Sequence, residues 1–273
     1  MSVLYISYDG ILDPLGASQI LPYLKSIVAV QSGMVVLSFE KEERSVRDGE
    51  AMAIVLKMHG IQWKPLRFTT GLGFFGKALD LAKMYFFGVH LARRHNVHVV
   101  HTRGHPTAQI GLLIKRLMGA KLIFDFRGLW VDERVDKGGW DLSRWFHRWQ
   151  YHHFKRTEHT LLANADQVVV LTQAVVSEVI KLGATPPSKI TVIPCCADFD
   201  HFPLATVQRQ AQARDSAGIP NDARVLGYLG SVGRMYMLDR FFRFFELASV
   251  QRKDIHALAV SYTHLTLPTI YSV

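Results

Sequence analysis

The sequence predicts an α/β fold in which a doubly wound parallel sheet is followed by the start of a second, similar domain. Short apolar runs of strand type alternate with longer segments whose apolar residues recur at helical spacing. A segment of different composition interrupts this alternation after residue 194, and the alternation restarts at residue 224. Strands that alternate with helices form parallel sheets covered on both faces, which is why the strands are apolar throughout.

The first strand is predicted at VLYISYD, and a glycine-containing loop with Pro14 leads from it into a helix that ends near Gly33. The further strands of the first domain are predicted at 34–40, 61–68, 97–103, 120–128, 167–171 and 189–194. The further helices are predicted at 41–59, 77–95, 106–119, 141–165 and 174–183.

The helix predicted at 141–165 is dense in basic and aromatic residues. We expect one amphipathic helix with Trp145, Phe146 and Trp149 in the core and with Arg148 and Lys155 on a solvated face. No nucleic-acid fold signature accompanies the charge, so no nucleic-acid partner is expected.

The domain boundaries are predicted from the break in the strand–helix alternation after residue 194 and from its restart at residue 224. Residues 1–199 are predicted to form the first domain, 200–223 an inter-domain linker, and 224–259 a truncated second Rossmann-like domain. Two strands and one helix cannot cover both faces of a sheet. The final segment, 260–273, is expected to be non-native, because VSYTHLTLPT is what a transposon end joined to a sequencing-primer site encodes.

Composition limits the classes of protein that fit. Hydrophobic residues at 49% and charged residues at 20% are typical of a globular chain, and the net charge of +9 favours anionic partners. No signal peptide and no apolar run of about 20 residues is evident, so a cytoplasmic protein is expected. The adjacent Cys195 and Cys196 are poorly placed for a disulfide with each other.

The loops after the strands are where ligands of such a sheet bind. In YDGILDPLGAS, the turn at Gly16 offers backbone amides to a phosphate or sugar hydroxyl, or merely permits the chain to turn. In HTRGH, the side chains of His101, Arg103 and His105 suit acid–base or anion-binding roles, or are solvated loop residues.

Two further loops carry stronger patterns. FDFRGLWVDE places Asp125, Arg127 and Glu133 near Trp130 in the sequence, and a sugar could stack on the ring of Trp130. The alternative is that the Asp and Arg of this motif form a purely structural ion pair. GYLGSVGR joins a strand to a helix through small residues that let amides approach a diphosphate. The stretch GLGFFGKALDLAKMYFFG could graze a membrane, although a packed helix is the simpler interpretation.

Together these motifs resemble the glycosyltransferases of family 4, which have the GT-B architecture of two Rossmann-like domains. The resemblance lies in ISYDGILDPLGASQILPYL, FDFRGLWVDE, ADQVVVLTQAVVSEVI, SKITVIPCCADFDHF and LGYLGSVGRMYMLDRFF, in that order, and covers residues 1 to about 259. It implies transfer of a sugar from a nucleotide-sugar donor with retention of anomeric configuration, without a metal or other cofactor.

The resemblance implies roles for the candidate residues. The catalytic candidates are Arg127, Asp125 and His105. The donor-binding candidates are Gly16, Gly230, Ser231, Gly233 and Arg234, and the acceptor-binding candidates are Asp13, Arg103, Trp130 and Glu133. Gly128 stands where a related R-D-L-W motif has Asp, and the two cysteines replace Asn and Gly of the usual junction.

The expected partners are a nucleotide sugar and a glycan or lipid-linked acceptor, with peripheral contact to the inner membrane face, in the synthesis of cell-surface or exopolysaccharide glycans. This chain itself is expected to be inactive, because the paired-glutamate motif of the second domain is not present. Three alternatives remain open: a module that binds a sugar or lipid head group without catalysis, a dinucleotide enzyme, and a basic peripheral membrane protein. The absence of G-x-G-x-x-G with an acidic residue after the second strand counts against the second alternative.

Overall fold

A computed structural model describes residues 2–30, 33–196, 199, 203–233, 236–261 and 270–271. The chain forms two compact units. The first comprises Met1–Val135 and Trp140–Cys195, and the second comprises Asp136–Gly139 and Cys196–Val273.

The first unit is built on a seven-stranded sheet of order β3-β2-β1-β4-β5-β6-β7, in which every neighbouring pair is parallel. Its strands are β1 Val3–Ser7, β2 Met34–Glu40, β3 Ile61–Arg67, β4 Val99–Arg103, β5 Lys121–Asp125, β6 Gln167–Val170 and β7 Ile190–Val192. Its helices are α1 Pro14–Gln19, α2 Leu21–Val30, α3 Glu42–Met58, α4 Gly73–Arg94, α5 His105–Met118, α6 Trp130–Asp136, α7 Trp145–Asn164 and α8 Gln173–Gly183, with a 3₁₀ turn at Pro187–Lys189. The prediction of a doubly wound parallel sheet is confirmed.

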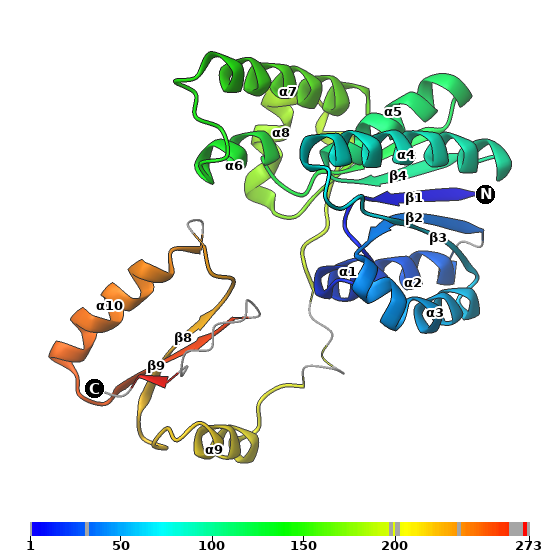
Figure 1. Cartoon of the computed structure of the whole chain (residues 1–273). Coiled ribbons are helices and arrows are strands. Elements are labelled where there is room, and N and C mark those ends of the chain that lie inside the picture. The colour runs from blue at the N-terminus through cyan, green and yellow to red at the C-terminus, as the bar shows by residue number, and fades with distance from the viewer. Residues whose placement is uncertain are drawn as a thin grey trace. The chain divides into compact units, whose positions relative to one another are not determined.

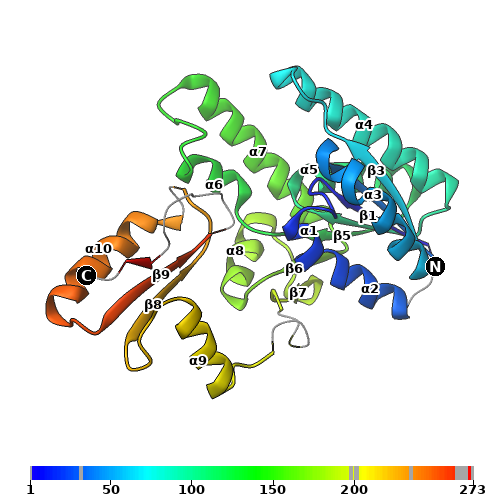
Figure 2. The same cartoon turned by 60° about the horizontal axis from the view of Figure 1, so that its bottom comes forward.

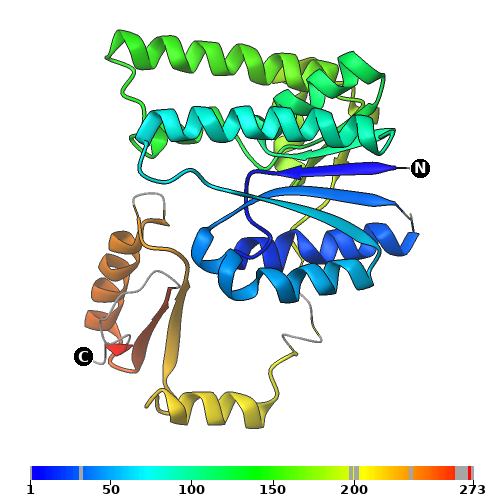
Figure 3. The ribbon, with the colours of Figure 1, turned by 45° about the vertical axis from the view of Figure 1, so that its right-hand side comes forward.

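Helices cover the two faces of this sheet in two groups. Figures 1 and 3 show α1, α2 and α3 on one side and α4, α5 and α7 on the other. The strand order explains this division: the chain moves outward from β1 to β3, returns to β4 beside β1, and then moves outward in the opposite direction. Right-handed crossovers therefore place the later helices on the opposite face, and the reversal lies between β1 and β4.

The core follows from the alternation of side chains along the strands. Leu4 and Ile6 of β1 belong to the large apolar cluster that contains residues of α4 and α5, whereas Val3 and Tyr5 belong to the cluster that contains residues of α2 and α3. All residues of β1 and β2 are buried. Burial of both faces accounts for the continuous apolar runs by which the sequence predicted these strands.

The first loop differs from its prediction, because a short helix begins inside it. Asp13 has an extended backbone and stands at the N-cap, and Pro14 occupies the first helical turn, where its fixed φ is favourable. Gly16, which reads as a turn residue in the sequence, is buried within this helix.

The prediction of which residues the long helix α7 buries was wrong. Trp145, Phe146 and Trp149 are 74%, 48% and 57% exposed. The buried residues of α7 are Glu158, Leu161 and Leu162, so the helix packs on the unit through its C-terminal half. Lys155, expected on a solvated face, has a side chain that is 21% exposed and pairs with two carboxylates.

The second unit contains one parallel strand pair and two helices. Its strands β8 Arg224–Leu229 and β9 Ile255–Val260 are joined by α10 Leu238–Gln251, which lies along them (Figure 2). The segment predicted as a linker contains α9 Val207–Ser216, whose N-terminus is capped by Thr206, since its hydroxyl accepts a hydrogen bond from Arg209 N. Most of the tail predicted from Val260 onward lies outside the described residues; Ile270–Tyr271 form β10, antiparallel to β9.

Candidate active site

The strand register brings the central candidate residues together. Ser7, Arg103 and Asp125 are aligned across β1, β4 and β5, and each is the last residue of its strand. Arg103 and Asp125 therefore lie next to each other at the carboxyl edge of the sheet, where the strand order reverses.

Arg103 is nearly fully buried, with a side chain that is 3% exposed. Its Nη2 donates to Gln19 Oε1 at 3.0 Å, its Nε to Asp9 Oδ2 at 3.3 Å, and its Nη1 lies 3.6 Å from Asp125 Oδ2. A buried guanidinium is tolerated when it is paired in this way. Arg103 is thus not a solvated loop residue but a fixed cation at the carboxyl end of β4.

Arg127 shares the partners of Arg103. Its Nη2 donates to Gln19 Oε1 at 2.6 Å, and its Nη1 lies 3.7 Å from Asp125 Oδ1. Cys195 Sγ also accepts from Arg127 Nη2, at 3.7 Å. Gln19 and Asp125 therefore hold two cations side by side, which suits recognition of an anionic group.

Gln19 was missed by the sequence analysis. It is the last residue of α1 and reaches residues that lie 84 and 108 positions further along the chain. Nothing local in the sequence marks it, because a single glutamine after a loop is common on protein surfaces.

Asp125 has a perturbed acidity. Burial raises the pKa of its carboxyl, and the nearby Arg127 and Arg103 lower it by less. Its Oδ1 is buried and lacks a hydrogen-bond partner among the described residues. Arg127 Nη1 lies 3.7 Å from this oxygen, so the carboxyl contributes to the site by holding the guanidinium groups in place.

His101 lies within β4, as the strand predicted at 97–103 implies, and is not a solvated loop residue. Its ring packs edge-on against Tyr5, with 4.9 Å between centroids. Burial, reinforced by the charge of Arg103, lowers the pKa of His101 to about 4. The imidazole is therefore neutral at physiological pH.

His105 stands at the start of α5 and is held by a buried carboxylate. Its Nε2 lies 2.8 Å from Glu158 Oε2, and Lys155 Nζ donates to Glu158 Oε1 at 2.6 Å. Lys155 also donates to Asp132, at 3.0 Å. Because an ionised carboxylate only accepts, a neutral His105 donates from Nε2 and keeps Nδ1 as an acceptor.

A cavity of about 210 Å³ brings several of the candidates together. Arg103, His105, Arg127, Trp130 and Glu133 all line it. His105 stacks on Trp130 with 5.7 Å between ring centroids, and Arg134 lies 5.0 Å from the same ring. These two neighbours reduce the ring surface that Trp130 offers to a sugar.

Asp13 and Gly16 do not line this cavity. Asp13 pairs with Lys41 at 3.1 Å and with Arg44 at 3.2 Å, which gives it a structural role beside α3. A side chain at Gly16 would overlap the backbone of Gly10 and Ile11, so close packing already requires a glycine here. Their assigned roles in acceptor and donor binding stay predictions.

Glu40 was also missed, although it stands as a lone carboxylate at the end of a buried strand. It accepts from the amides of Ile11 and Leu12 at 2.8 and 3.1 Å and from Ser38 Oγ at 2.6 Å. Burial raises its pKa, and these hydrogen bonds lower it by less. Glu40 is thus an acidic residue at the end of the second strand, and its partners lie in the loop after β1.

The second unit carries the other glycine loop. Gly230 and Ser231 follow β8, and Gly233 has φ +155°, a conformation that favours glycine. Tyr228 Oη donates to the carbonyl of Ser231 at 2.7 Å. A cavity of about 650 Å³ lies beside this loop and the start of α10. Arg234 lies outside the described residues, and all five donor-binding roles stay predictions.

Within the described residues, no cluster of three or more His, Cys, Asp or Glu side chains is arranged to hold a metal ion. No helix among them combines the length and apolar character that a bilayer span requires.

The comparisons with known proteins agree with this architecture. Residues 31–196 match the family described as the glycosyl transferase 4-like domain. A D-inositol 3-phosphate glycosyltransferase of Corynebacterium urealyticum is 32% identical over 78 residues, which are 29% of this chain and 18% of that protein.

Solved structures resemble the chain over nearly its whole length. HepE from Anabaena, in complex with UDP and glucose, superposes with a TM-score of 0.59 at 15% identity, covering 95% of this chain and 60% of that one. Sucrose-phosphate synthase from Thermosynechococcus elongatus gives a TM-score of 0.62 at 14% identity, covering 98% of this chain and 64% of that one. This chain thus spans less than two thirds of these relatives.

At such identities the structural likeness establishes the fold, which is that of GT-B glycosyltransferases. The family match covers more than half of the chain and includes β2 to β7. The chain therefore belongs to the glycosyl transferase 4-like family.

Proposed function

We propose that the protein is a retaining glycosyltransferase that moves a sugar from a nucleotide-sugar donor to a glycan or lipid-linked acceptor. Its proposed setting is the cytoplasmic side of a membrane, in the synthesis of a cell-surface glycan or exopolysaccharide. The observation that carries this proposal is the pair of guanidinium groups of Arg103 and Arg127, held by Gln19 and Asp125 at the carboxyl edge of the sheet. Membership of the family supplies the class of reaction.

The proposed chemistry is electrostatic. When the bond between sugar and diphosphate breaks, negative charge grows on the leaving nucleotide, and fixed donors stabilise it without reorganising. The amides of Gly230, Ser231 and Gly233 are proposed to act on that diphosphate. Arg103 and Arg127 are proposed to fix anionic or hydroxyl groups of the substrates, and His105, oriented by Glu158, lines the same cavity.

Calorimetric titration of the 273-residue chain with UDP-, GDP- and ADP-sugars, and with NAD for comparison, tests this proposal. We expect one nucleotide sugar to bind more tightly than NAD, and Arg127→Ala to weaken binding of that donor or of the acceptor at least tenfold. Arg67→Ala is the matched control, because that exposed arginine forms a surface ion pair with Glu42. Binding of NAD in preference to every nucleotide sugar would overturn the proposal.

A transfer assay separates the remaining possibilities. Sugar transfer with retained configuration would establish the reaction and would overturn only the expectation that this chain is inactive. Nucleotide-sugar binding without turnover agrees both with descent from a glycosyltransferase and with the expectation that this chain is inactive. Binding of a glycan or lipid head group without any nucleotide sugar would favour the non-catalytic binding module instead.

A further inference from the structure

The helices α4, α5 and α7 carry most of the excess positive charge of the chain. They contain nine Lys and Arg against two carboxylates, and the rest of the chain is nearly balanced, with 23 against 21. Both carboxylates are turned inward: Asp80 pairs with Lys83 and is 3% exposed, and Glu158 pairs with Lys155 and is 0% exposed. The outward surface of these three helices therefore presents cations and no carboxylate.

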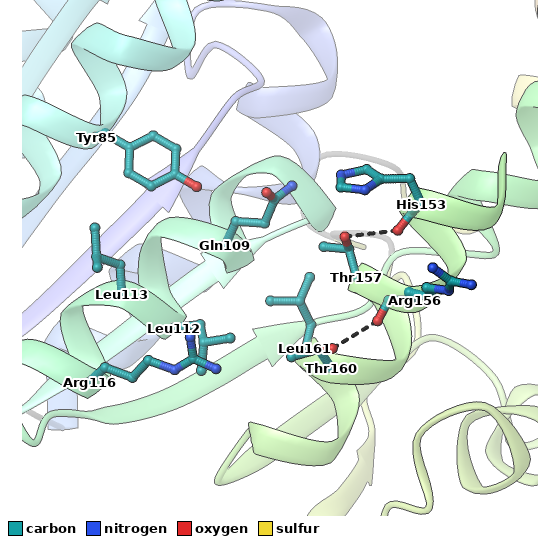
Figure 4. Close-up of a pocket in the computed structure, with 10 residues that line it drawn as sticks. All are labelled: Tyr85, Gln109, Leu112, Leu113, Arg116, His153, Arg156, Thr157, Thr160 and Leu161. Carbon is teal, nitrogen blue, oxygen red and sulfur yellow. Dashed lines mark hydrogen bonds between the residues drawn. The ribbon is translucent and has the colours of Figure 1, made fainter. Parts of the chain in front are cut away.

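A groove of about 390 Å³ lies on this outward surface, over α5 and between α4 and α7 (Figure 4). Tyr85 comes from α4, Gln109 and Arg116 from α5, and His153 and Arg156 from α7. No described carboxylate pairs with Arg116 or Arg156, both of which are exposed. Arg116 and Arg156 lie on opposite sides of the groove (Figure 4), and their guanidinium groups, together with the phenol, amide and imidazole of the lining, are donors that phosphate oxygens accept from. None of the residues that line this groove lines the cavity of the candidate active site.

A row of aromatic side chains leads from the start of α7 into the groove. Phe146 stacks on Trp149 with 6.1 Å between centroids, and Trp149 stacks on His153 at 5.4 Å. Trp145 adds a further exposed ring at the N-terminus of the helix. Large exposed aromatic residues on a cationic face are typical of surfaces that enter a lipid headgroup region.

The other two helices, α4 and α5, also carry exposed apolar side chains. Phe86 and Leu79 of α4 are 67% and 47% exposed, and Leu117 of α5 is 54% exposed. A nucleic acid would stack on the aromatic rings but would leave the aliphatic side chains of Leu79 and Leu117 in water. A lipid surface would cover both kinds of residue.

We propose that the outer face of α4, α5 and α7 docks on a bilayer that contains anionic phospholipid, with a lipid phosphate in the groove between Arg116 and Arg156. Trp145 and Trp149 enter the headgroup region beside it. The charge of the face complements that of an anionic leaflet, which attracts each nearby basic residue with about 1 kcal/mol, or about fivefold in affinity. This inference rests on the proposed membrane contact but not on sugar transfer.

Sedimentation of the 273-residue chain with vesicles tests the docking face. We expect binding to vesicles of phosphatidylcholine mixed with phosphatidylglycerol, weaker binding as salt rises, and little binding to phosphatidylcholine alone. No binding to the mixed vesicles, or equal binding to both kinds, would overturn the proposal. Nucleotide-sugar titration without vesicles is a separate readout, so failure of one proposal is distinguishable from failure of the other.

Variants assign the binding to particular residues. Arg116→Ser with Arg156→Ser should weaken binding to mixed vesicles about thirtyfold. The matched control removes two charges from the opposite helix layer, Lys25→Ser with Lys57→Ser, and should weaken binding much less. Equal effects of the two pairs would show that only net charge matters and would refute the groove.

A third variant and a competitor complete the test. Trp145→Ser with Trp149→Ser should abolish the blue shift of tryptophan fluorescence on mixed vesicles, while thermal unfolding confirms that all variants fold. Single-stranded RNA should not displace the chain from mixed vesicles at equal phosphate concentration. Displacement by RNA, weakened by the arginine variants, would assign the face to nucleic acid and contradict the proposal.

Discussion

His105 and Glu158 form a buried hydrogen bond of 2.8 Å that joins the first residue of α5 to the middle of α7. Their side chains are 6% and 0% exposed. Through Glu158, the imidazole that lines the candidate cavity is linked to Lys155 and Asp132. The position of this histidine is thus fixed by a helix whose other end carries the proposed membrane-docking aromatics.

Removing Glu158 should destabilise the fold. Glu158→Ala leaves the Lys155 ammonium with one carboxylate instead of two and leaves His105 without its acceptor, and breaking a buried pair typically costs about 3–5 kcal/mol. Urea unfolding should show this loss in the midpoint at unchanged slope. Glu178→Ala is the control, since Glu178 pairs with Lys181 on an exposed helix surface, and it should cost less than about 1 kcal/mol. Equal losses would contradict the structural role of Glu158.

The neutral state of His101 should make stability depend on pH. Because its pKa is lowered to about 4 in the folded chain and is near 6.5 when unfolded, the unfolded state binds the proton first as pH falls. The free energy of unfolding should therefore keep its full value above about pH 6.5. It should fall progressively as the pH drops to about 4, by about 3 kcal/mol in all. In His101→Gln this part of the pH dependence should disappear, whereas His59→Gln, at an exposed position, should keep it. Imidazole resonances that place the titration of His101 near 6.5 would refute the assignment.

Gly16 should not tolerate a side chain. In Gly16→Ala the new methyl group would overlap the backbone of Gly10 and Ile11, and we expect a loss of at least about 2 kcal/mol as the loop or α1 shifts. Gly49→Ala, in the interior of α3 with its nearest neighbour 3.6 Å away, should instead stabilise by about 0.5–1 kcal/mol. Thermal unfolding of the two variants measures both changes. A Gly16→Ala variant as stable as the parent would show that packing does not require this glycine.

Arg127 and Arg103 should differ in what their loss does to the fold. Arg103 is 3% exposed and has three partners, so Arg103→Ala should cost several kcal/mol of stability, about 3 or more. Arg127 is 19% exposed, and Arg127→Ala should cost about 1 kcal/mol while weakening ligand binding. Chemical unfolding beside titration separates the two effects. If both variants lose stability equally, weaker ligand binding by Arg127→Ala reflects loss of the fold and not loss of a contact to the ligand.

The sequence predicted most of the sheet because buried parallel strands are apolar on both faces. It also placed Arg103, Asp125 and Arg127 at strand ends, and parallel register then brings them together. It could not identify Gln19 or Glu158, because their contacts span 84 and 53 residues and depend on how helices pack.

The long helix shows the limit of periodicity. Aromatic residues at helical spacing predicted a buried stripe at Trp145 and Trp149, yet only the C-terminal half of α7 contributes buried residues. Periodicity gives the face of a helix but not the length over which its neighbours cover it. The short helix at Pro14 was missed for a related reason, since proline and glycine in a loop are ambiguous between a turn and a helix start.

Hydrogen–deuterium exchange of the 273-residue chain, with and without its best-binding nucleotide sugar, tests whether the strand-end loops bind that ligand. We expect slower exchange in the loop after β5, residues 126–129, and in the loop at 230–233, with no change in α3. Protection confined to other segments, or none at saturating ligand, would contradict the proposal that each of these strand-end loops binds the nucleotide sugar.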